Sequence, residues 1–299
     1  MGEILFQTHA LCKNYNGKNV VDNVSLAVKK GDIYGFVGLN GAGKTTLMRM
    51  AAGLIRPTAG SLSLFGATGD KLDEARRKTA SIIENPVFYP SMSGRENVAA
   101  YLGLLGKDKT KAAEYLRTVR LDPQSPKKAR SFSLGMKQRL SIAMALAADA
   151  ELLFLDEPTN GLDPEGMYEI RELLKYLNKE RGVTIFISSH ILSELEKLAT
   201  TYGFIHYGRL IKEATLHEIE ASMYKGYILE ATDNALAHKI MSDAGVASNI
   251  IDGTLAIKGD INVSEAVAKL SGAGVAVLSL TAKHAELEDY FRNLIGGAQ

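Results

Sequence analysis

One stretch of the chain has the residue types and spacing of a loop that binds phosphate: Gly38-Leu39-Asn40-Gly41-Ala42-Gly43-Lys44-Thr45. Glycines let the backbone curl so that successive N–H groups converge on phosphate oxygens, a concavity that larger side chains would block. The helix expected after the loop adds the positive end of its dipole. We expect the Lys44 ammonium to reach the β- and γ-phosphates and the Thr45 hydroxyl to bind Mg²⁺. The sequence therefore predicts a site for a nucleoside triphosphate.

A second candidate element is an apolar run that ends in two carboxylates, Leu152-Leu153-Phe154-Leu155-Asp156-Glu157. Ligands of parallel sheets gather at the carboxyl edge of the strands, which is where these acids should lie. We expect Asp156 to hold Mg²⁺, directly or through water, and Glu157 to polarise the attacking water. Strands that end in two acids are common, so this pair gains its meaning from the motifs around it.

Between these two elements stands Ser131-Phe132-Ser133-Leu134-Gly135-Met136-Lys137-Gln138-Arg139, which is similar to the signature loop of the ABC ATPase family. The resemblance covers about residues 4–214, although the family usually has a second glycine where Leu134 stands. It implies that Ser133 and Gly135, at a helix N-terminus, bind the γ-phosphate of ATP held by the opposite subunit. The alternative for Ser133 is an ordinary helix N-cap.

Three further elements follow in the order of that family. Asn160-Gly161-Leu162-Asp163 resembles the loop whose aspartate communicates between paired sites, and His190 resembles the switch histidine that contacts the γ-phosphate and positions Glu157. Tyr15 resembles the aromatic residue that stacks on adenine. The resemblance thus implies ATP-binding positions at Tyr15, Gly38, Leu39, Asn40, Gly41, Ala42, Gly43, Lys44, Thr45, Thr46, Ser133, Gly135 and Asp163. Glu157 and His190 are the implied catalytic residues.

One position departs from the family pattern. Glu84 stands where a glutamine usually contacts Mg²⁺ and touches the membrane partner, so the expected metal ligands are Thr45, Asp156 and Glu84. A carboxylate is a charged ligand and an amide a neutral one, so Mg²⁺ affinity and coupling to the partner can differ. The segment Ile83-Glu84-Asn85-Pro86-Val87-Phe88-Tyr89-Pro90 resembles that of ATPases in the bacitracin and lantibiotic self-protection group.

The elements that must position these residues follow an α/β pattern up to about Ala214. Continuously apolar runs predict buried strands, and longer runs predict helices. The expected strands are Ile33–Val37, Ser81–Glu84, Leu152–Asp156 and Thr184–Ser188. The expected helices are Thr45–Leu54, Arg95–Leu105, Thr110–Val119, Met136–Ala148, Glu165–Lys179 and Ile191–Leu198. Ser93 and Glu96 form a capping-box signal, and Pro164 suits a first helical position.

A different pattern follows in residues 215–299, which we interpret as an accessory α+β domain beside an ATPase domain of residues 1–214. Its expected order is strand Tyr227–Ala231, helix Ala235–Asp243, a hairpin over Ile250–Ile257 turned at Asp252-Gly253, helix Ser264–Leu270, strand Val275–Leu280 and helix Ala285–Leu294. That order is the split βαβ, or ferredoxin-like, arrangement. The resemblance adds that the ATPase core has an antiparallel β subdomain and a helical subdomain.

Bulk properties narrow the function classes. The chain has 299 residues, 46% of them hydrophobic and 23% charged, as in ordinary globular proteins. A net charge of +1 argues against a nucleic-acid partner, and the single Cys12 excludes an internal disulfide. No run approaches the roughly 20 apolar residues of a membrane-spanning helix, and the N-terminal residues lack the basic, then apolar, then small-residue pattern of a signal peptide. We therefore expect the chain to stay in the cytosol, and the family resemblance adds that a membrane partner holds it at the cytoplasmic face of the membrane.

The resemblance implies an ATPase subunit that powers a separate integral-membrane permease. It also implies that two ATPase subunits, expected to be identical copies, enclose ATP and Mg²⁺ head to tail, with the segment from Glu84 to Glu96 facing the permease. The likeness to the self-protection group implies export of a peptide antibiotic or another amphiphile, which would give resistance or immunity. The alternative is a soluble ATPase of the same type that acts in translation, DNA repair or cofactor assembly. A pull-down from detergent-solubilised membranes would separate the two.

Overall fold

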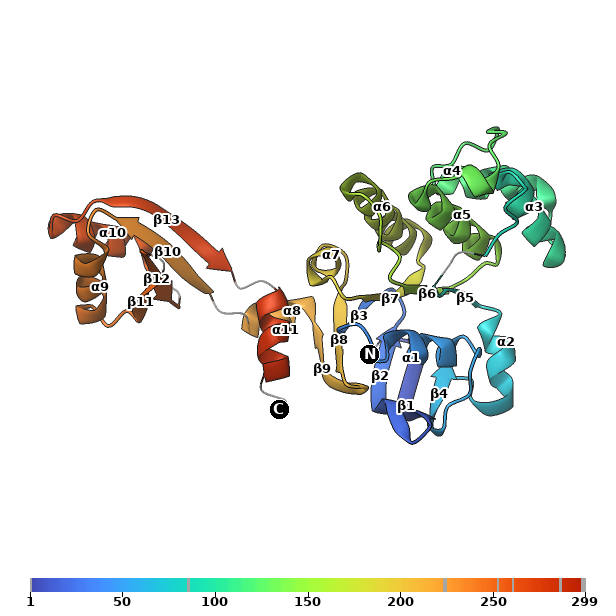
Figure 1. The fold of residues 1–299 in the computed structure, drawn as a ribbon, viewed down its shortest axis with the longest axis horizontal. Helices are drawn as coiled ribbons and strands as arrows, with labels where there is room; N and C mark the ends of the chain where they lie inside the picture. The colour runs from blue at the N-terminus through green and yellow to red at the C-terminus, as the bar shows by residue number, and fades with distance from the viewer. Residues whose placement is uncertain are drawn as a thin grey trace. The chain divides into compact units, whose positions relative to one another are not determined.

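The computed structural model describes residues 2–84, 87–222, 225–251, 253–259, 261–284 and 287–296. The chain forms two compact units, one extending to Leu216 and the other comprising His217–Gly296 (Figure 1). Within the described residues, no helix combines the length and apolar character needed to cross a bilayer.

The first unit is built around a mixed sheet with the strand order β5-β6-β7-β3-β8-β9. All neighbouring strands are parallel except β8 and β9. Every residue of β3, β6 and β7 is buried, as their continuous apolar runs predict. The strands are β3 (Ile33–Val37), β5 (Thr79–Ile82), β6 (Leu152–Asp156), β7 (Thr184–Ser189), β8 (Thr201–His206) and β9 (Arg209–Thr215).

An antiparallel sheet, ordered β2-β1-β4, packs on one side of the central sheet. Its strands are β1 (Ile4–Tyr15), β2 (Lys18–Lys29) and β4 (Ala59–Leu64). Buried side chains of both sheets and of α1 (Lys44–Ala51) share one hydrophobic core. Phe186 of β7 lies at its centre, with ring centroids 5.2 Å from Tyr34, 5.7 Å from Phe6 and 5.7 Å from Phe154. The core thus holds the central strands against the antiparallel sheet.

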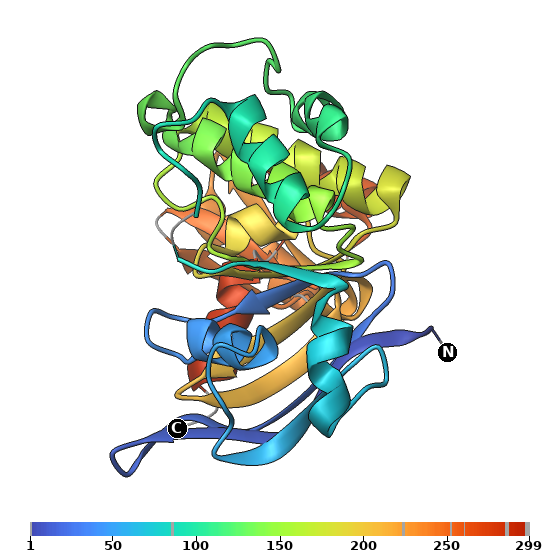
Figure 2. The same cartoon turned by 90° about the vertical axis from the view of Figure 1, so that its right-hand side faces the viewer.

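Helices cover the other side of the central sheet, as Figure 2 shows for the green segments. Ser93 and Glu96 form a complete capping box at the start of α3, and Pro164 occupies the first turn of α6, so both local predictions are confirmed. Besides α1, the helices described in this unit are η1 (Gly69–Lys71), α2 (Leu72–Arg76), α3 (Gly94–Leu104), η2 (Lys109–Lys111), α4 (Ala112–Thr118), η3 (Ala129–Ser131), α5 (Leu134–Ala147), α6 (Pro164–Arg181) and α7 (Leu192–Glu196).

The second unit contains an antiparallel sheet ordered β11-β12-β10-β13, which is the ferredoxin-like order, so this part of the fold prediction is confirmed. Its core is formed by residues such as Leu229, Met241, Leu255 and Leu270. The predicted turn residue Asp252 lies outside the described residues. The elements are α8 (Leu216–Ser222), β10 (Lys225–Ala231), α9 (Asn234–Asp243), β11 (Ser248–Ile251), β12 (Thr254–Lys258), α10 (Val263–Gly272), β13 (Val277–His284) and α11 (Leu287–Gly296).

Among the strand boundaries that differ from the prediction, the end of β5 bears on the site. The run expected to reach Glu84 ends at Ile82, because Glu84 has a φ of +64°, in the left-handed region that a strand cannot contain. This turn carries the Glu84 side chain out of the sheet.

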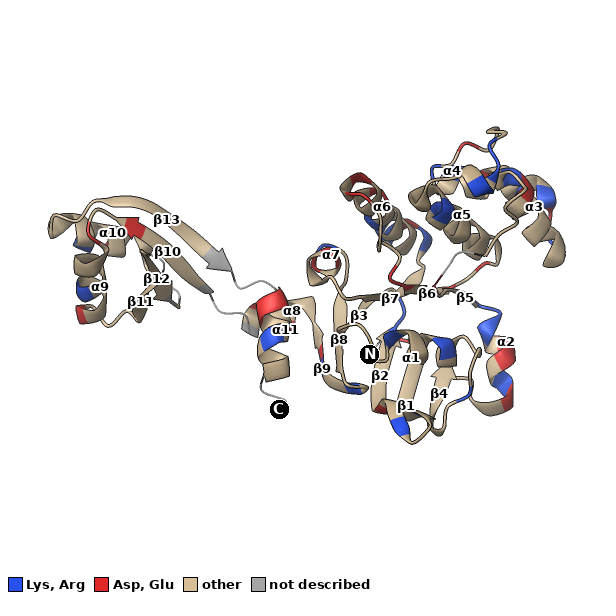
Figure 3. Ribbon diagram, in the orientation of Figure 1, with Lys and Arg blue, Asp and Glu red and all other residues tan. Residues whose placement is uncertain are grey.

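Charged residues of both signs are interspersed over the helices of the first unit (Figure 3). In α6, Glu165 lies in the first turn and Lys179 and Arg181 lie in the last. Each of these three side chains is next to the helix end of opposite partial charge, which stabilises the helix.

The capping box generates a pH-dependent prediction. The Glu96 carboxylate accepts hydrogen bonds from the Ser93 N–H (2.6 Å) and from Lys128 Nζ (3.0 Å), which lower the pKa of Glu96 from 4.5 to about 2. Because the pKa is lower in the folded state, Glu96 stabilises the protein fully above pH 4.5 and loses this effect as pH falls toward 2. Urea unfolding of wild type and Glu96→Gln should therefore differ most near neutral pH and converge in acid. A difference that stays constant from pH 7 to acid would contradict the assignment.

Candidate active site

The predicted phosphate loop connects β3 to α1, as the strand–loop–helix context requires. Gly43 has a φ of +107°, and a Cβ there would lie 2.5 Å from the Val20 carbonyl oxygen. A Cβ at Gly38 would lie 2.5 Å from the Ile205 carbonyl oxygen. Glycine is therefore required at both positions, by backbone conformation at Gly43 and by close packing at both. The N–H groups of Lys44, Thr45 and Thr46 lie in the first helical turn, where α1 itself supplies no acceptor. The loop thus offers a concave set of donors suited to phosphate.

The Lys44 side chain is 5% exposed, and its ammonium lies among three oxygen atoms. Its Nζ donates to the carbonyl oxygens of Gly38 (2.7 Å) and Leu39 (3.3 Å) and lies 3.2 Å from Glu157 Oε1. The other Glu157 oxygen contacts His190 Nδ1. Lys44, Glu157 and His190, predicted from three separate motifs, therefore form one connected group.

Asp156 lies beside this group. Its Oδ2 accepts a hydrogen bond from Thr45 Oγ1 at 2.7 Å, and its Oδ1 accepts one from Ser188 Oγ at 2.6 Å. A hydroxyl and a carboxylate at this separation are oxygen donors of the type that Mg²⁺ prefers, with further positions left to phosphate oxygens and water. The side chains present therefore fit a magnesium ion at Thr45 and Asp156.

Strand topology explains why these residues meet. β6, β7 and β3 are adjacent and parallel, so Asp156, His190 and the phosphate loop all lie where strands end, and the carboxyl ends of these strands share one edge of the sheet.

Tyr15 lies farther out, at the end of β1. Its side chain is 44% exposed, and Lys13 Nζ lies 5.1 Å from the centroid of its ring. Tyr15 pairs with Lys18 near the start of β2, the strand that places Val20 against Gly43.

The signature residues lie elsewhere in the unit. Ser133 caps α5 by accepting a hydrogen bond from the Met136 N–H (3.3 Å), and Asp163 caps α6 by accepting one from the Gly166 N–H (2.9 Å). Ser133, Gly135 and Asp163 line one cavity of about 390 Å³ that contains no residue of the phosphate loop. The structure thus brings the signature and the Asp163 loop together, and separates both from Lys44.

The contact that the Glu84 side chain makes was not predicted from the sequence. Its carboxylate contacts the Arg49 guanidinium of α1, and its side chain is 59% exposed. The neighbouring Asn85 and Pro86 lie outside the described residues. To ligate a metal next to Thr45, Glu84 would have to leave Arg49. Arg49 carried no sequence signal, because a basic residue on an exposed helix face is ordinary.

Ser188 was also missed, although a signal was present. It is a hydroxyl residue in a strand whose residues are all buried, and buried hydroxyls need hydrogen-bond partners. Thr159, which follows Glu157 in the chain, similarly contacts Glu194 of α7, two residues into the helix after His190. Both contacts link the acidic strand end to the segment around the histidine.

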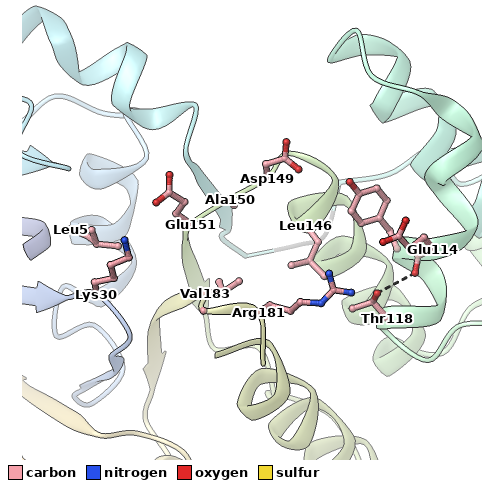
Figure 4. Close-up of a pocket in the computed structure, with 12 residues that line it drawn as sticks. Leu5, Lys30, Glu114, Thr118, Leu146, Asp149, Ala150, Glu151, Arg181 and Val183 are labelled. Carbon is pink, nitrogen blue, oxygen red and sulfur yellow. Dashed lines mark hydrogen bonds between the residues drawn. The ribbon is translucent and has the colours of Figure 1, made fainter. Parts of the chain in front are cut away.

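Another cavity, of about 510 Å³, lies at the opposite, amino edge of the sheet (Figure 4). Arg181 extends into it toward Thr118 of α4, and Glu151 and Val183 mark the starts of β6 and β7. Asp149 and Glu151 in its wall are paired with Lys107 (2.5 Å) and Lys78 (3.4 Å), which lie outside the lining. It has no glycine loop like that at Gly38–Gly43, so the catalytic candidates remain at the carboxyl edge.

Comparisons with known proteins agree with this geometry. The ABC transporter family model matches residues 21–160. The chain is 42% identical to the bacitracin transport ATP-binding protein BcrA of Bacillus licheniformis, over 98% of each chain. It is 43% identical to the lantibiotic transport ATP-binding protein SrtF of Streptococcus pyogenes, over 68% of this chain and 87% of that protein.

Among solved structures, a dimeric ATP-binding cassette in a post-hydrolysis state bound to ADP and Pi is similar, with a TM-score of 0.64 and 25% identity. The likeness covers 71% of this chain and 99% of that one. The family match, the near full-length relatives and the cassette fold agree with one another. This chain belongs to the ABC transporter family, as one of its ATP-hydrolysing subunits.

Proposed function

We propose that the group formed by Lys44, Thr45, Asp156, Glu157 and His190 binds and hydrolyses ATP with Mg²⁺. The convergence of Lys44 and His190 on the Glu157 carboxylate, at one sheet edge, is the observation that carries this proposal. The donors of the loop from Gly38 to Thr46 hold the phosphates, and Tyr15 supports the adenine ring. When bound at Thr45 and Asp156, Mg²⁺ supplies charge neutralisation on the phosphates.

Within this site each side chain has a separate task. Phosphate oxygens compete with Glu157 for the Lys44 ammonium, so nucleotide binding releases the Glu157 carboxylate from its ion pair. Glu157 then orients and polarises the attacking water as a general base. His190, already in contact with Glu157, holds that carboxylate in place and reaches the γ-phosphate.

We further propose that two copies of the chain assemble head to tail, so that Ser133, Gly135 and Asp163 of each complete the site of the other. The separation of the signature cavity from the phosphate loop within one copy supports this arrangement. The similarity to a cassette described as dimeric supports it independently. A two-fold dimer of this kind closes both sites together, with ATP favouring the closed state.

The assembly is proposed to work at the cytoplasmic face of the membrane, bound to an integral-membrane permease through the segment from Glu84 to Glu96. The Arg49–Glu84 contact supports this route, because it joins the phosphate-loop helix directly to the proposed contact segment. In this view Glu84 would be a further oxygen ligand for Mg²⁺ once it leaves Arg49. The names of the relatives support export of a peptide antibiotic such as bacitracin or a lantibiotic. A role in translation, DNA repair or cofactor assembly has no such support.

Replacement of Lys44 tests the phosphate site. Lys44→Ala removes charge-assisted hydrogen bonds to phosphate, so the Kd of a fluorescent ATP analogue should rise about 10- to 100-fold. Lys239→Ala, on the exposed surface of α9, is the matched control and should bind as wild type. Thermal unfolding of both variants verifies the fold. Undiminished binding by folded Lys44→Ala would contradict the assignment of this loop.

Replacement of Glu157 tests catalysis and assembly together. Glu157→Gln keeps the side-chain shape but cannot act as a base, so it should bind ATP, hydrolyse it about 100-fold or more slowly, and accumulate as a dimer. Phosphate release and size-exclusion chromatography with light scattering measure the two effects. Glu172→Gln on α6 serves as the control. Turnover at the wild-type rate would remove Glu157 from its catalytic role, and a monomer in saturating ATP would contradict the head-to-tail arrangement.

The substrate proposal is tested in cells. Expression of the chain together with its membrane partner should raise the concentrations of bacitracin or of a lantibiotic that inhibit growth of a sensitive host. The Glu157→Gln variant, produced at the same level, should give no protection, because transport requires hydrolysis. Equal sensitivity of cells carrying wild type, the variant or no ATPase would reject peptide antibiotics as the substrate class without affecting the ATPase assignment.

A further inference from the structure

Ser188 occupies an unusual position at the carboxyl end of the central sheet. It is the penultimate residue of β7 and its side chain is fully buried. In the parallel pairing of β6 and β7 it is the direct partner of Asp156. Side chains of paired residues in neighbouring strands lie on the same face of a sheet, so the Ser188 hydroxyl and the Asp156 carboxylate are held side by side.

The hydroxyl of Ser188 uses both its donor and its acceptor capacity in the site. It donates to Asp156 Oδ1 at 2.6 Å and accepts from the Glu157 N–H at 3.1 Å. The second Asp156 oxygen accepts from Thr45 Oγ1 at 2.7 Å. The Asp156 carboxylate is therefore fixed from two sides, by a hydroxyl of the phosphate-loop helix and by a hydroxyl of β7, and only the second also reaches Glu157.

The backbone of Glu157 needs such support. Glu157 has a φ of +49°, a left-handed conformation that a non-glycine residue adopts only when its surroundings hold it there. Its N–H is directed at Ser188, where it meets both the hydroxyl (3.1 Å) and the carbonyl oxygen (3.2 Å). This backbone conformation turns the Glu157 side chain toward Lys44 and His190 instead of along the strand.

We propose that Ser188 is a positioning residue that sets the metal-binding carboxylate of Asp156 and the water-polarising carboxylate of Glu157 in one fixed relation. The inference rests on the proposed roles of Asp156 and Glu157. Ser188 itself touches neither substrate nor metal; it acts through the two acidic residues. Without its hydroxyl, Asp156 loses one of its two orienting bonds and the Glu157 N–H keeps only the carbonyl.

The adjacent serine supplies a natural comparison. Ser189 is also buried, but its register partner is Val37 of β3, and among the residues that the structure describes its hydroxyl bonds to the backbone of Ile191, at 2.9 and 3.2 Å. Ser189→Ala therefore removes a buried hydroxyl from the same strand end without disturbing Asp156 or Glu157.

The test compares substitutions in the full-length chain. Ser188→Ala deletes the hydroxyl, and Ser189→Ala is its matched control. Ser188→Thr and Ser188→Val form an isosteric pair that adds the same bulk, so any crowding is common to both and only the hydroxyl differs. Measurements are kcat and KM for ATP, and the Kd of a fluorescent ATP analogue with Mg²⁺ and with EDTA. Thermal unfolding verifies the fold.

Positioning predicts a specific pattern. Ser188→Ala and Ser188→Val should lose about 10- to 100-fold in kcat, as is typical when a partner that orients a metal ligand is removed. They should also lose most of the gain in nucleotide affinity that Mg²⁺ provides, while binding in EDTA stays as in wild type. Ser188→Thr should retain both properties, and Ser189→Ala should resemble wild type. A merely structural role would change stability without separating metal-dependent from metal-independent binding.

Two results would overturn the inference about Ser188, and both can be told apart from the result that would overturn the proposed ATPase function. If Ser188→Thr and Ser188→Val share the same kcat and the same Mg²⁺-dependent gain in affinity while wild type is active, the hydroxyl has no positioning role and the ATPase site stands. If Ser189→Ala lowers kcat and the Mg²⁺-dependent gain in affinity as much as Ser188→Ala does, the loss comes from disturbing the end of the strand and not from the Ser188 hydroxyl. If wild type itself neither binds nor hydrolyses ATP, the assignments of Asp156 and Glu157 fail, and this inference with them.

Discussion

The parallel pairing of β6, β7 and β3 brings the candidate site together. Asp156 pairs with Ser188, Ser188 with Phe36, and Ser189 with Val37, so the loops that follow the three strands leave the sheet at one edge. The pairing is held by burial: every residue of these strands is buried, and the Phe186 ring packs against aromatic rings of β1, β3 and β6. A shift of one residue would turn these rings away from the core and separate the polar groups at the edge.

The charged residues of the site form ion pairs that nucleotide binding can displace. Lys44 pairs with Glu157 and Arg49 pairs with Glu84, so two carboxylates of the proposed site are held by cations from the same helix, α1. The two pairs differ in strength, because Lys44 is buried, whereas Glu84 is more than half exposed and screened by water. Nucleotide binding therefore has to displace the strong Lys44–Glu157 pair and can rearrange the weak Arg49–Glu84 pair. The second pair links the phosphate site to the segment proposed to meet the permease.

The two acidic residues show how a short motif depends on distant support. Asp156 and Glu157 are adjacent in the chain, yet they face different partners because Glu157 adopts a left-handed backbone conformation. Thr45, Ser188, Lys44 and His190, from three other segments, satisfy their oxygens and the Glu157 N–H. The shared cavity of Ser133 and Asp163 follows the same pattern, because both residues are N-caps of helices that converge there.

The sequence alone determined the phosphate loop, the buried strands β3 and β6 with their boundaries, the capping box at Ser93 and the order of the second unit, because each depends on local residue types and periodicity. It identified Lys44, Asp156, Glu157 and His190 as candidates through motif spacing. Only the tertiary structure decided that Lys44 contacts Glu157, that Glu84 turns to Arg49 and that Ser188 joins the two acids. These contacts depend on strand order, register and a left-handed residue, and packing between segments far apart in the chain fixes all three.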